Sequence, residues 1–312
     1  MNLTGVLPFL RSKGFPFGIG GIVAGKRISS LPRTPVCGPV IADTDCIPSL
    51  LNAAAEINKS EPDCRIQIKS TIATLNSEES RVVKIPWRET YTLSLPDSHE
   101  ELRFGNKTRN HRIKSAVSKA EKSGIKIRLA ENETDLKAWY QLYLETMRSV
   151  AVPARPYRLF KYMFEKLKPA GMMRLLLAEL NDNKSKRLLT GSIFLSYNKT
   201  FYYAFNGRKL DEPALHQNDY VLYTAIKTAR QEGFKYFDFG EVTSDNEGLA
   251  RFKSKWGCDT KQLYHYYHPL PEDFDIKTVD SGSNGSSLRK LIWKKLPLNV
   301  TQILGDKIYQ YL

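Results

Sequence analysis

The hydrophobic and polar positions of the chain follow two periods, one typical of strands and one typical of helices. After Gly124, segments with the strand period alternate with segments with the helix period. Strands are predicted at residues 125–129, 172–180, 188–197, 200–206, 236–239 and 263–268. Helices are predicted at residues 133–148, 157–167, 218–232 and, in a short form, just after the strand that ends at Phe239. This alternation predicts a layered α/β domain.

The first 104 residues show a sparser pattern of the same kind. Strands are predicted at residues 4–10, 27–31, 65–68 and 89–95, and a helix at 48–58. The helix-then-strand unit at 48–68 has a counterpart at 220–239, which is weak evidence of an internal duplication. The glycine-rich segment 14–21 lacks the Gly-Lys-Ser/Thr ending of a phosphate-binding loop, so a hairpin turn is the better interpretation.

Residues 237–257 form the best-specified local structure. The strand run ends at Gly240, Ser244 and Glu247 have the spacing of a helix-capping box, and Gly257 can close the helix in a left-handed conformation. Residues of the short helix that share one face at helical spacing are Leu249, Phe252, Lys253 and Trp256, whereas Arg251 and Lys255 point away.

Lys253 is therefore directed inward, and two interpretations stay open. Its ammonium group can snorkel past the aromatic side chains to water. Alternatively, a cation is held at a protected site to meet a phosphate or a developing oxyanion.

Asp238-Phe239-Gly240, followed by Gly248-Leu249-x-x-Phe252-Lys253-x-x-x-Gly257, resembles the C-terminal signature of the Fem-type peptidoglycan aminoacyltransferases and their FemAB-like relatives in the GNAT acyltransferase superfamily. The resemblance implies two GNAT-like halves in tandem. The first, residues 1–104, is expected to be shortened at its N-terminus, and the second, residues 105–270, to be complete. Residues 271–312 are expected to form a Ser/Gly-rich linker and a basic amphipathic tail.

The resemblance also implies positions for the site. Lys253 is the first candidate catalytic residue, with Phe252 beside it near the acyl donor. Arg155 follows a Glu145-Thr-Met-Arg148 segment that resembles the family's region between the first two helices, so it is expected to contact the acceptor.

Four other residues complete the candidate site. Glu241 follows the strand whose end lines the cleft in GNAT proteins, so it is a candidate general base, with a plain turn residue as the alternative. Tyr203, Arg208 and Asn246 are the remaining candidate substrate-binding residues. The segment 208–213 has no glycine where a GNAT coenzyme A loop would carry several, which weakens a coenzyme A interpretation.

Charge and composition restrict the partners. The 312 residues are 41% hydrophobic, as in an ordinary globular protein, and their formal net charge is +14. This excess predicts anionic partners: aminoacyl-tRNA or acyl-CoA as donor, a sugar nucleotide or lipid-linked acceptor, and an anionic membrane surface. The four cysteines form no Cys-x-x-Cys pair, so free thiols in a reducing cytoplasm are expected. His265 and His268 lack a third ligand nearby, so they are expected to be packing residues and no metal is predicted.

Two further segments carry positive charge. The helix predicted at 106–123 has basic residues outside its apolar face, which suits either a solvated surface or contact with RNA. The tail at 288–312 combines Trp293 with several lysines, so it can lie on a membrane interface, peripheral on the inner leaflet, or dock on the N-terminal half.

These observations together predict an N-acyltransferase that moves an aminoacyl or acyl group onto an amine of a cell-envelope precursor, of peptidoglycan or exopolysaccharide, without a tightly bound cofactor. No Ser-His-Asp or Cys-His arrangement is evident, so direct attack by the amine is expected. One alternative is an acyl-CoA-dependent amino-sugar N-acyltransferase. The other is a non-catalytic RNA-binding or membrane-surface protein on a decayed GNAT scaffold.

Overall fold

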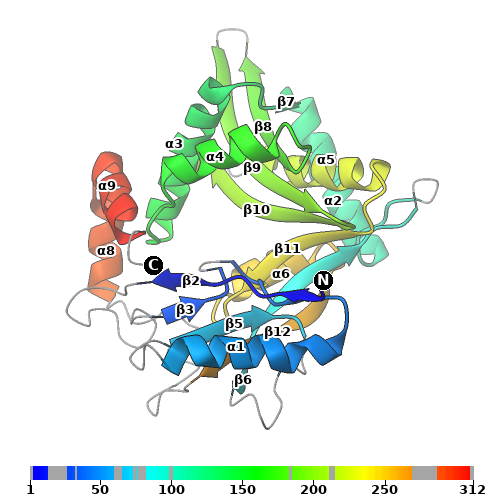
Figure 1. Cartoon of the computed structure of the whole chain (residues 1–312). Helices are drawn as coiled ribbons and strands as arrows, with labels where there is room; N and C mark the ends of the chain where they lie inside the picture. Colours follow the sequence, from blue (N-terminus) through cyan, green and yellow to red (C-terminus); the bar gives the residue numbers. More distant parts are fainter. Residues whose placement is uncertain are drawn as a thin grey trace.

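A single large sheet runs through the molecule. The computed structural model describes residues 3–12, 27–31, 34–59, 65–72, 75, 82–97, 101–182, 185–210, 215–268 and 287–309. Within these ranges ten strands form one sheet in the order β2-β3-β5-β12-β6-β11-β10-β9-β8-β7 (Figure 1). Two short strands, β1 (Gly5–Val6) and β4 (Val40–Ile41), pair separately. The predicted α/β layered class is confirmed.

The first part of the sheet is covered on one face by a single helix. Strands β2 (Leu10–Ser12), β3 (Arg27–Ser29) and β5 (Arg65–Ser70) lie beside one another, and α1 (Ile47–Lys59) packs its apolar side on them (Figure 1). The core between helix and sheet consists of Ile28, Ile47, Leu51, Ala54, Ile66, Ile68, Leu75 and Tyr266.

The last strand of the sheet in sequence joins the two parts of the molecule. β12 (Asp259–His268) pairs antiparallel with β5 on one side and with β6 (Val83–Ser94) on the other. Its residue Tyr266 enters the core beneath α1, although it follows the whole second half in the chain. The two halves therefore share hydrogen bonds and apolar contacts.

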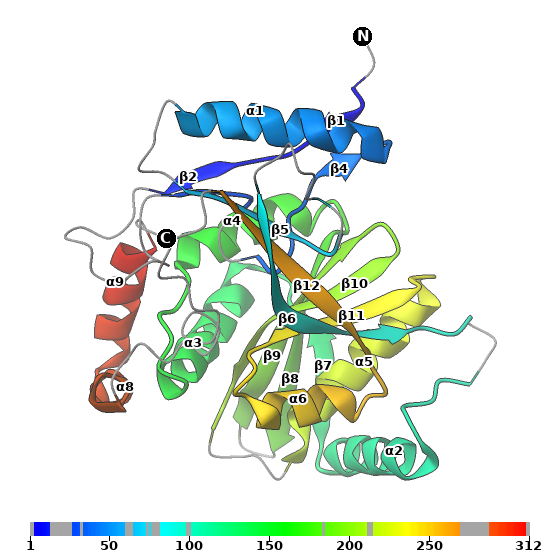
Figure 2. The ribbon, with the colours of Figure 1, turned by 90° about the horizontal axis from the view of Figure 1, so that it is seen from below.

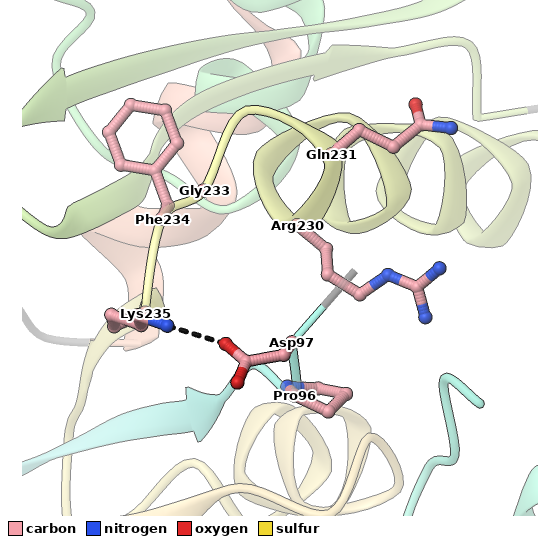
Figure 3. A pocket seen from close by; sticks show the side chains of 7 residues that line it. All are labelled: Pro96, Asp97, Arg230, Gln231, Gly233, Phe234 and Lys235. Atoms are coloured by element: carbon pink, nitrogen blue, oxygen red, sulfur yellow. Dashed lines mark hydrogen bonds and ion pairs between the residues drawn. The ribbon is translucent and has the colours of Figure 1, made fainter. Parts of the chain in front are cut away.

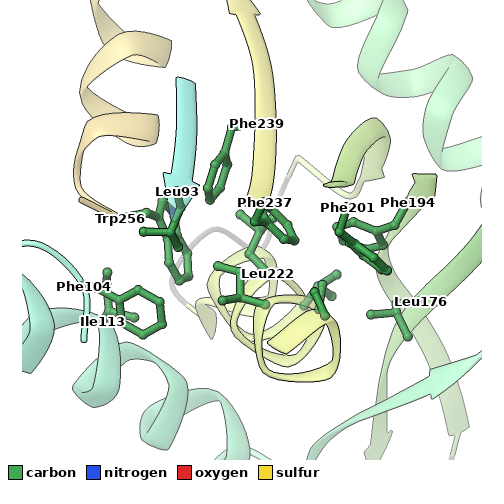
Figure 4. Close-up of a cluster of buried hydrophobic side chains, with 14 of the residues drawn as sticks. Leu93, Phe104, Ile113, Leu176, Phe194, Phe201, Leu222, Phe237, Phe239 and Trp256 are labelled. Carbon is green, nitrogen blue, oxygen red and sulfur yellow. The ribbon is translucent and has the colours of Figure 1, made fainter. Parts of the chain in front are cut away.

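The second half is a sheet between two helical layers (Figures 1 and 2). Its strands are β7 (Ile125–Leu129), β8 (Met173–Asp182), β9 (Ser185–Tyr197), β10 (Thr200–Arg208) and β11 (Tyr236–Val242). One face is covered by α3 (Glu133–Ser149) and α4 (Tyr157–Leu167). The other face is covered by α2 (Lys107–Lys122), α5 (Gln217–Gln231) and α6 (Glu247–Ser254), whose core is shown in Figure 4.

Strand β8 shows why the half has two cores. Leu176 and Ala178 face the α2–α5 layer, while Leu175 and Leu177 face the α3–α4 layer. Successive side chains of a strand point to opposite faces, so a strand that is apolar on both faces must be covered on both.

Several element boundaries differ from the sequence predictions: β6 begins at Val83 rather than at residue 89, and β12 at Asp259 rather than at residue 263. Three other differences have a local reason. Residues 4–10 do not form one strand but two short pieces separated by Pro8, which has no amide to donate to a ladder. β11 does not end at Gly240 but continues to Val242 through a bulge. Helix α6 is capped by Asn246, whose Oδ1 accepts the Leu249 amide at 3.0 Å, not by Ser244.

The tail forms two helices, α8 (Ser287–Lys295) and α9 (Leu298–Ile308), beside α3 (Figures 1 and 2). Leu298 packs into the α3–α4 core, and Gly305 lies so close to Ala154 that an added Cβ would stand 2.6 Å from the Ala154 carbonyl oxygen. The tail thus docks on the second half, not on the N-terminal half. The glycine-rich segment 14–21 and residues 275–286 of the linker lie outside the described residues.

Candidate active site

Strands β10 and β11 separate from each other along their length. They pair in parallel only through Thr200–Tyr236, Phe201–Phe237 and Tyr202–Asp238, although β10 runs to Arg208 and β11 to Val242. Figure 1 shows the two strands diverging from a common end. We call this opening of the sheet the splay. Unpaired strand edges are places where an extended ligand can take hydrogen bonds from the backbone.

A bulge marks each strand where the splay begins. The register of β10 against β9 shifts between Tyr203 and Phe205, and that of β11 against β6 shifts between Asp238 and Glu241. Gly240, inside the second bulge, has a φ of +77°, a conformation that favours glycine. Bulges bend strands and re-aim side chains, and they are frequent beside active sites.

Lys253 on α6 stabilises the bulge of β11 by hydrogen bonds to its backbone. Its Nζ donates to the Gly240 carbonyl at 2.9 Å and to the Glu241 carbonyl at 3.0 Å, and the residue is only 4% exposed. Burial lowers the pKa of Lys253 to about 8, against the opposing influence of the Asp238 and Glu241 carboxylates. The inward orientation predicted from the sequence is confirmed, and the snorkelling interpretation is wrong because the ammonium group stays buried.

Asp238 supports the same bulge. Its Oδ1 accepts the Gly240 amide at 2.6 Å and the Thr90 hydroxyl at 2.9 Å. Burial raises the pKa of this carboxyl, while these two hydrogen bonds and the Lys253 cation act in the opposite direction. Asp238 is distinguished in the sequence only by its place in the Asp-Phe-Gly motif.

Glu241 lies on the splayed end of β11. Arg88 on β6 donates to its Oε1 at 2.6 Å. Its Oε2 is buried and has no hydrogen-bond partner among the described residues. A carboxylate oxygen that is desolvated and not satisfied by a donor can accept a proton from a ligand placed beside it, as a general base must.

A second buried lysine faces this region from the first half. Lys69 on β5 is 7% exposed, and its Nζ reaches the carbonyls of Leu31 and Thr34, each at 3.3 Å. Burial is the largest cause that lowers its pKa to about 8, and the Arg27 and Arg155 cations lower it further. Glu241 acts in the opposite direction. Lys69 could not be recognised as a candidate from the sequence, because one lysine in the strand pattern Arg-Ile-Gln-Ile-Lys is typical of a solvent-facing position.

Polar side chains form a buried network next to Lys69, on the face of the sheet away from α1. Gln67 accepts from Ser29 at 3.0 Å and donates to the Tyr267 hydroxyl at 2.9 Å. His265 stacks on Trp87 with 4.0 Å between ring centroids, and burial keeps its pKa well below the ordinary value, so the ring is neutral. A buried polar face without an apolar core is unusual for a structural sheet and typical of a binding surface.

The structure brings Arg155 to the same region from the second half. Arg155 lies on the loop between α3 and α4, with its guanidinium 5.0 Å from the centroid of the Phe205 ring. The positive charge of Arg155 is also one of the influences that lower the pKa of Lys69, which lies in the first half. Arg208, another candidate, ends β10, and its amide donates to the Thr146 hydroxyl at 2.9 Å.

Three candidate substrate contacts lie elsewhere. Tyr203 is packed in the α2–α5 core against Phe194 and Phe239, and burial raises its pKa to about 12. The Asn246 side chain is engaged as the α6 cap. Phe252 is half-buried beneath the Lys255 ammonium, 4.7 Å from its ring centroid. The three side chains are thus engaged in packing or in capping. Among the described residues no contact places them at the opening of the splay.

A small hollow on the surface lies away from these groups. Its volume is about 220 Å³, and Figure 3 shows the Lys235–Asp97 ion pair crossing it at 2.6 Å. Lys235 precedes the first residue of β11, whereas Glu241 is near the other end of that strand. The hollow therefore opens at the closed end of the splay.

The described residues contain no group of three His, Cys, Asp or Glu side chains that could hold a metal ion.

Comparison with known proteins agrees with this architecture. Residues 106–254 match the family model described as an acetyltransferase (GNAT) domain. No curated protein sequence matches the chain. The fold is similar to that of FemX, with a TM-score of 0.58 and 16% identity over 83% of this chain and 87% of that one.

Two other solved structures share the fold. One is the C-terminal domain of a protein described as a lysylphosphatidylglycerol synthetase from Agrobacterium fabrum, with a TM-score of 0.61 and 11% identity over 91% of this chain and 86% of that one. The other is L-PGS from Bacillus licheniformis, with a TM-score of 0.58 and 12% identity over 97% of this chain and 86% of that one. At these identities the likeness shows the fold alone.

Proposed function

We propose that this chain, whose residues 106–254 form a GNAT acyltransferase domain, transfers an aminoacyl or acyl group from an activated donor to an amine of a cell-envelope precursor. The observation that carries the proposal is the splay between β10 and β11, with the unsatisfied Glu241 Oε2 at its edge. The structural similarity to FemX and to a protein described as a lysylphosphatidylglycerol synthetase supports a donor of the aminoacyl kind.

The reaction needs a base and a positioned electrophile. The amine attacks the carbonyl carbon of the ester or thioester, a tetrahedral oxyanion forms, and the donor's oxygen or sulfur leaves. In this proposal Glu241 Oε2, which has no hydrogen-bond partner among the described residues, accepts the proton that the amine loses. Lys253 is a positioning residue, because it binds the Gly240 and Glu241 carbonyls and so fixes the direction of the Glu241 side chain.

Direct transfer is supported by the state of the thiols. Burial raises the pKa of Cys37, and it raises that of Cys258 to about 12. Both are therefore protonated at neutral pH, and a thiol is a weak nucleophile compared with its thiolate. A covalent cysteine intermediate is disfavoured at these two positions.

The charges that face the splay suit an anionic acceptor. Arg27 from the first half and Arg155 from the second both act electrostatically on Lys69, and the Glu241 carboxylate acts on it in the opposite direction. Excess positive charge at a protected place is relieved by a bound anion. A phosphate-bearing acceptor, either a sugar nucleotide or a lipid-linked sugar, supplies that charge.

The N-terminus of α5 argues against coenzyme A as donor. In the first turn of this helix Asp219 forms an ion pair with Lys255 at 2.6 Å. A carboxylate at a helix N-terminus takes the place where the helix would otherwise attract a pyrophosphate. Aminoacyl-tRNA is therefore the favoured donor.

The proposal is tested with purified protein, an aminoacyl-tRNA pool, a set of acyl-CoA thioesters and amine acceptors of the peptidoglycan and exopolysaccharide precursor types. Loss of the donor ester and the mass of the product are followed together. We expect turnover with aminoacyl-tRNA, and a fall of about 100-fold or more in Glu241→Gln, the range for loss of a general base.

Glu89→Gln is the matched control, because Glu89 is an exposed neighbour on β6 and undergoes the same chemical change. Equal turnover in the two variants would remove Glu241 as the base. Consumption of neither donor class with any acceptor would support the non-catalytic alternative.

A further inference from the structure

The tail helices leave large apolar side chains in solvent at one edge of the molecule. Together with the loop between α3 and α4 they form what we call the tail surface. Its exposed apolar residues, with their exposed fractions, are Val150 (55%), Val152 (43%), Leu291 (54%), Ile292 (54%) and Ile303 (55%). Figures 1 and 2 both place α8 and α9 together at this edge, beside α3.

This exposure does not come from a loosely attached tail. Thr301 is 2% exposed, Leu298 enters the α3–α4 core, and Gly305 packs on the Ala154 backbone. Arg148, at the end of α3, donates to the Leu296 carbonyl at 3.3 Å. The inner sides of the helices are thus fixed, and the loop with Val150 and Val152 is fixed to the junction of α8 and α9.

The charge around the apolar residues has one sign. Lys290, Lys294, Lys295 and Lys307 are exposed on α8 and α9, and Asp306, the acidic residue among residues 287–309, is half-buried. A second copy of this chain would bring like charges together on such a surface. RNA would satisfy the lysines but not the leucine and isoleucine side chains. An anionic bilayer satisfies both.

The length of the helices decides how they can meet a bilayer. α8 has 9 residues and α9 has 11, whereas a membrane span needs about 20. Among the described residues no helix is long and apolar enough to cross a membrane. The geometry therefore suits helices that lie on the surface of the bilayer.

We propose that the tail surface docks on an anionic membrane, with Leu291 and Ile292 inserted among the acyl chains and the lysines of α8 among the headgroups. The loop that carries Val150 and Val152 continues directly to Arg155. Docking would therefore bring the acceptor side of the splay to the membrane, where a lipid-linked acceptor is presented. Only this last point rests on the proposed function, because membrane binding needs no turnover.

The test is co-sedimentation of the whole chain with vesicles of phosphatidylcholine alone or mixed with about one-third phosphatidylglycerol. Wild type should bind the mixed vesicles and bind those of phosphatidylcholine far more weakly. Leu291→Ser with Ile292→Ser should reduce the partition coefficient about 10-fold or more, since the variant loses the inserted side chains. Replacing Lys290, Lys294 and Lys295 with Gln should reduce it about 100-fold at low salt.

Two matched controls keep the test specific. Leu129→Ser removes an apolar side chain of similar exposure (52%) at the end of β7. Replacing Lys107, Lys119 and Lys122 with Gln makes the same change of net charge on α2. Both should bind like wild type. The proposal is overturned if the controls lose as much binding as the tail variants, if wild type does not sediment with anionic vesicles, or if RNA competes away all vesicle binding.

Discussion

Within the part of the chain that the structure describes, each half of the molecule buries one lysine, Lys69 on β5 and Lys253 on α6. Lys69 and Lys253 each donate to two backbone carbonyls, and burial lowers the pKa of each to about 8. Around Lys253 the neighbouring charges are carboxylates, Asp238 and Glu241. Around Lys69 the strongest charge influence is the Arg27 cation, followed by the Glu241 carboxylate.

A structural cation and a cation that binds a ligand differ in their hydrogen bonds and in the charges around them. The bonds of Lys253 are 2.9 and 3.0 Å, and its charge is compensated locally, so the site is complete without a ligand. The bonds of Lys69 are both 3.3 Å, and the strongest charge that acts on it, that of Arg27, is repulsive. We infer that Lys253 shapes the splay, while Lys69 meets the anionic acceptor.

The largest effect is expected for Lys253→Met. The change leaves two buried carbonyls without their donor and two carboxylates without their cation, so the free energy of unfolding should fall by about 2–4 kcal/mol. Turnover should fall by about 100-fold, because the bulge no longer holds Glu241 in place. Urea denaturation and donor-ester consumption measure the two quantities. A stable and fully active variant would show that the lysine positions nothing.

Lys69→Met should separate the two lysines. Stability should change by less than about 1 kcal/mol, because the hydrogen bonds lost are long and a repelled cation is removed. The KM for a phosphate-bearing acceptor should rise about 10-fold, while kcat changes little. Displacement of the bound acceptor by inorganic pyrophosphate, measured in wild type and in Lys69→Met, checks the same point without turnover. If Lys69→Met instead unfolds the protein as much as Lys253→Met does, the two lysines have the same role.

The pH dependence of the free energy of unfolding gives a further test of the role of Lys69. The ordinary pKa of a lysine, 10.5, is that of the unfolded chain, and the folded value of Lys69 is about 8. Above pH 8 the unfolded chain therefore holds more protons than the folded one, so stability rises with pH. From about pH 9 the buried Cys258 acts in the opposite direction, because its folded pKa is raised from 9.0 to about 12.

The window in which the lysine contribution stands alone is thus pH 8 to 9. Between these values the stability difference between wild type and Lys69→Met should change by about 1 kcal/mol in favour of wild type. Urea melts at the two pH values measure it. Parallel curves for the two proteins would mean that Lys69 titrates at its ordinary pKa.

The smallest effects are expected on the outer side of α6. Lys255, predicted from the sequence to point away from the core, forms the ion pair with Asp219 and is half-buried. Lys255→Met should therefore cost about 0.5–1 kcal/mol in stability and leave turnover near wild type. Arg251→Met, at an exposed position of the same helix, should change stability by at most about 0.5 kcal/mol. A large loss of turnover in Lys255→Met would mean that the N-terminus of α5 takes part in donor binding.

Much of the second half could be predicted because its determinants are local. The ends of α4 were predicted to the residue, and Asn106 and Asn132 cap α2 and α3 where the predicted helices begin. The apolar face of α5 packs on the sheet as its periodicity indicates. Capping and periodicity act within a few residues, so the sequence shows them directly.

The parts that could not be predicted depend on distant partners. Nothing in residues 259–268 reveals that they lie between β5 and β6, because strand pairing leaves no local trace. Asn246 replaces Ser244 as the cap because β11 continues past Gly240, held by Lys253. Lys69 differs from other strand lysines by its burial and by the charges of Arg27, Arg155 and Glu241, which come from three other segments.

The position of β12 has a consequence for how the protein is made. β5 is completed at Ser70, but its neighbour in the sheet ends at His268, about 200 residues later. At ribosomal rates of about 5–20 residues per second, the nascent first half waits about 10–40 s with strand edges open and Tyr266 missing from its core. Pairing so distant in sequence also slows folding. We therefore expect early nascent chains to depend on holding chaperones, and truncation before residue 259 to yield an aggregation-prone first half.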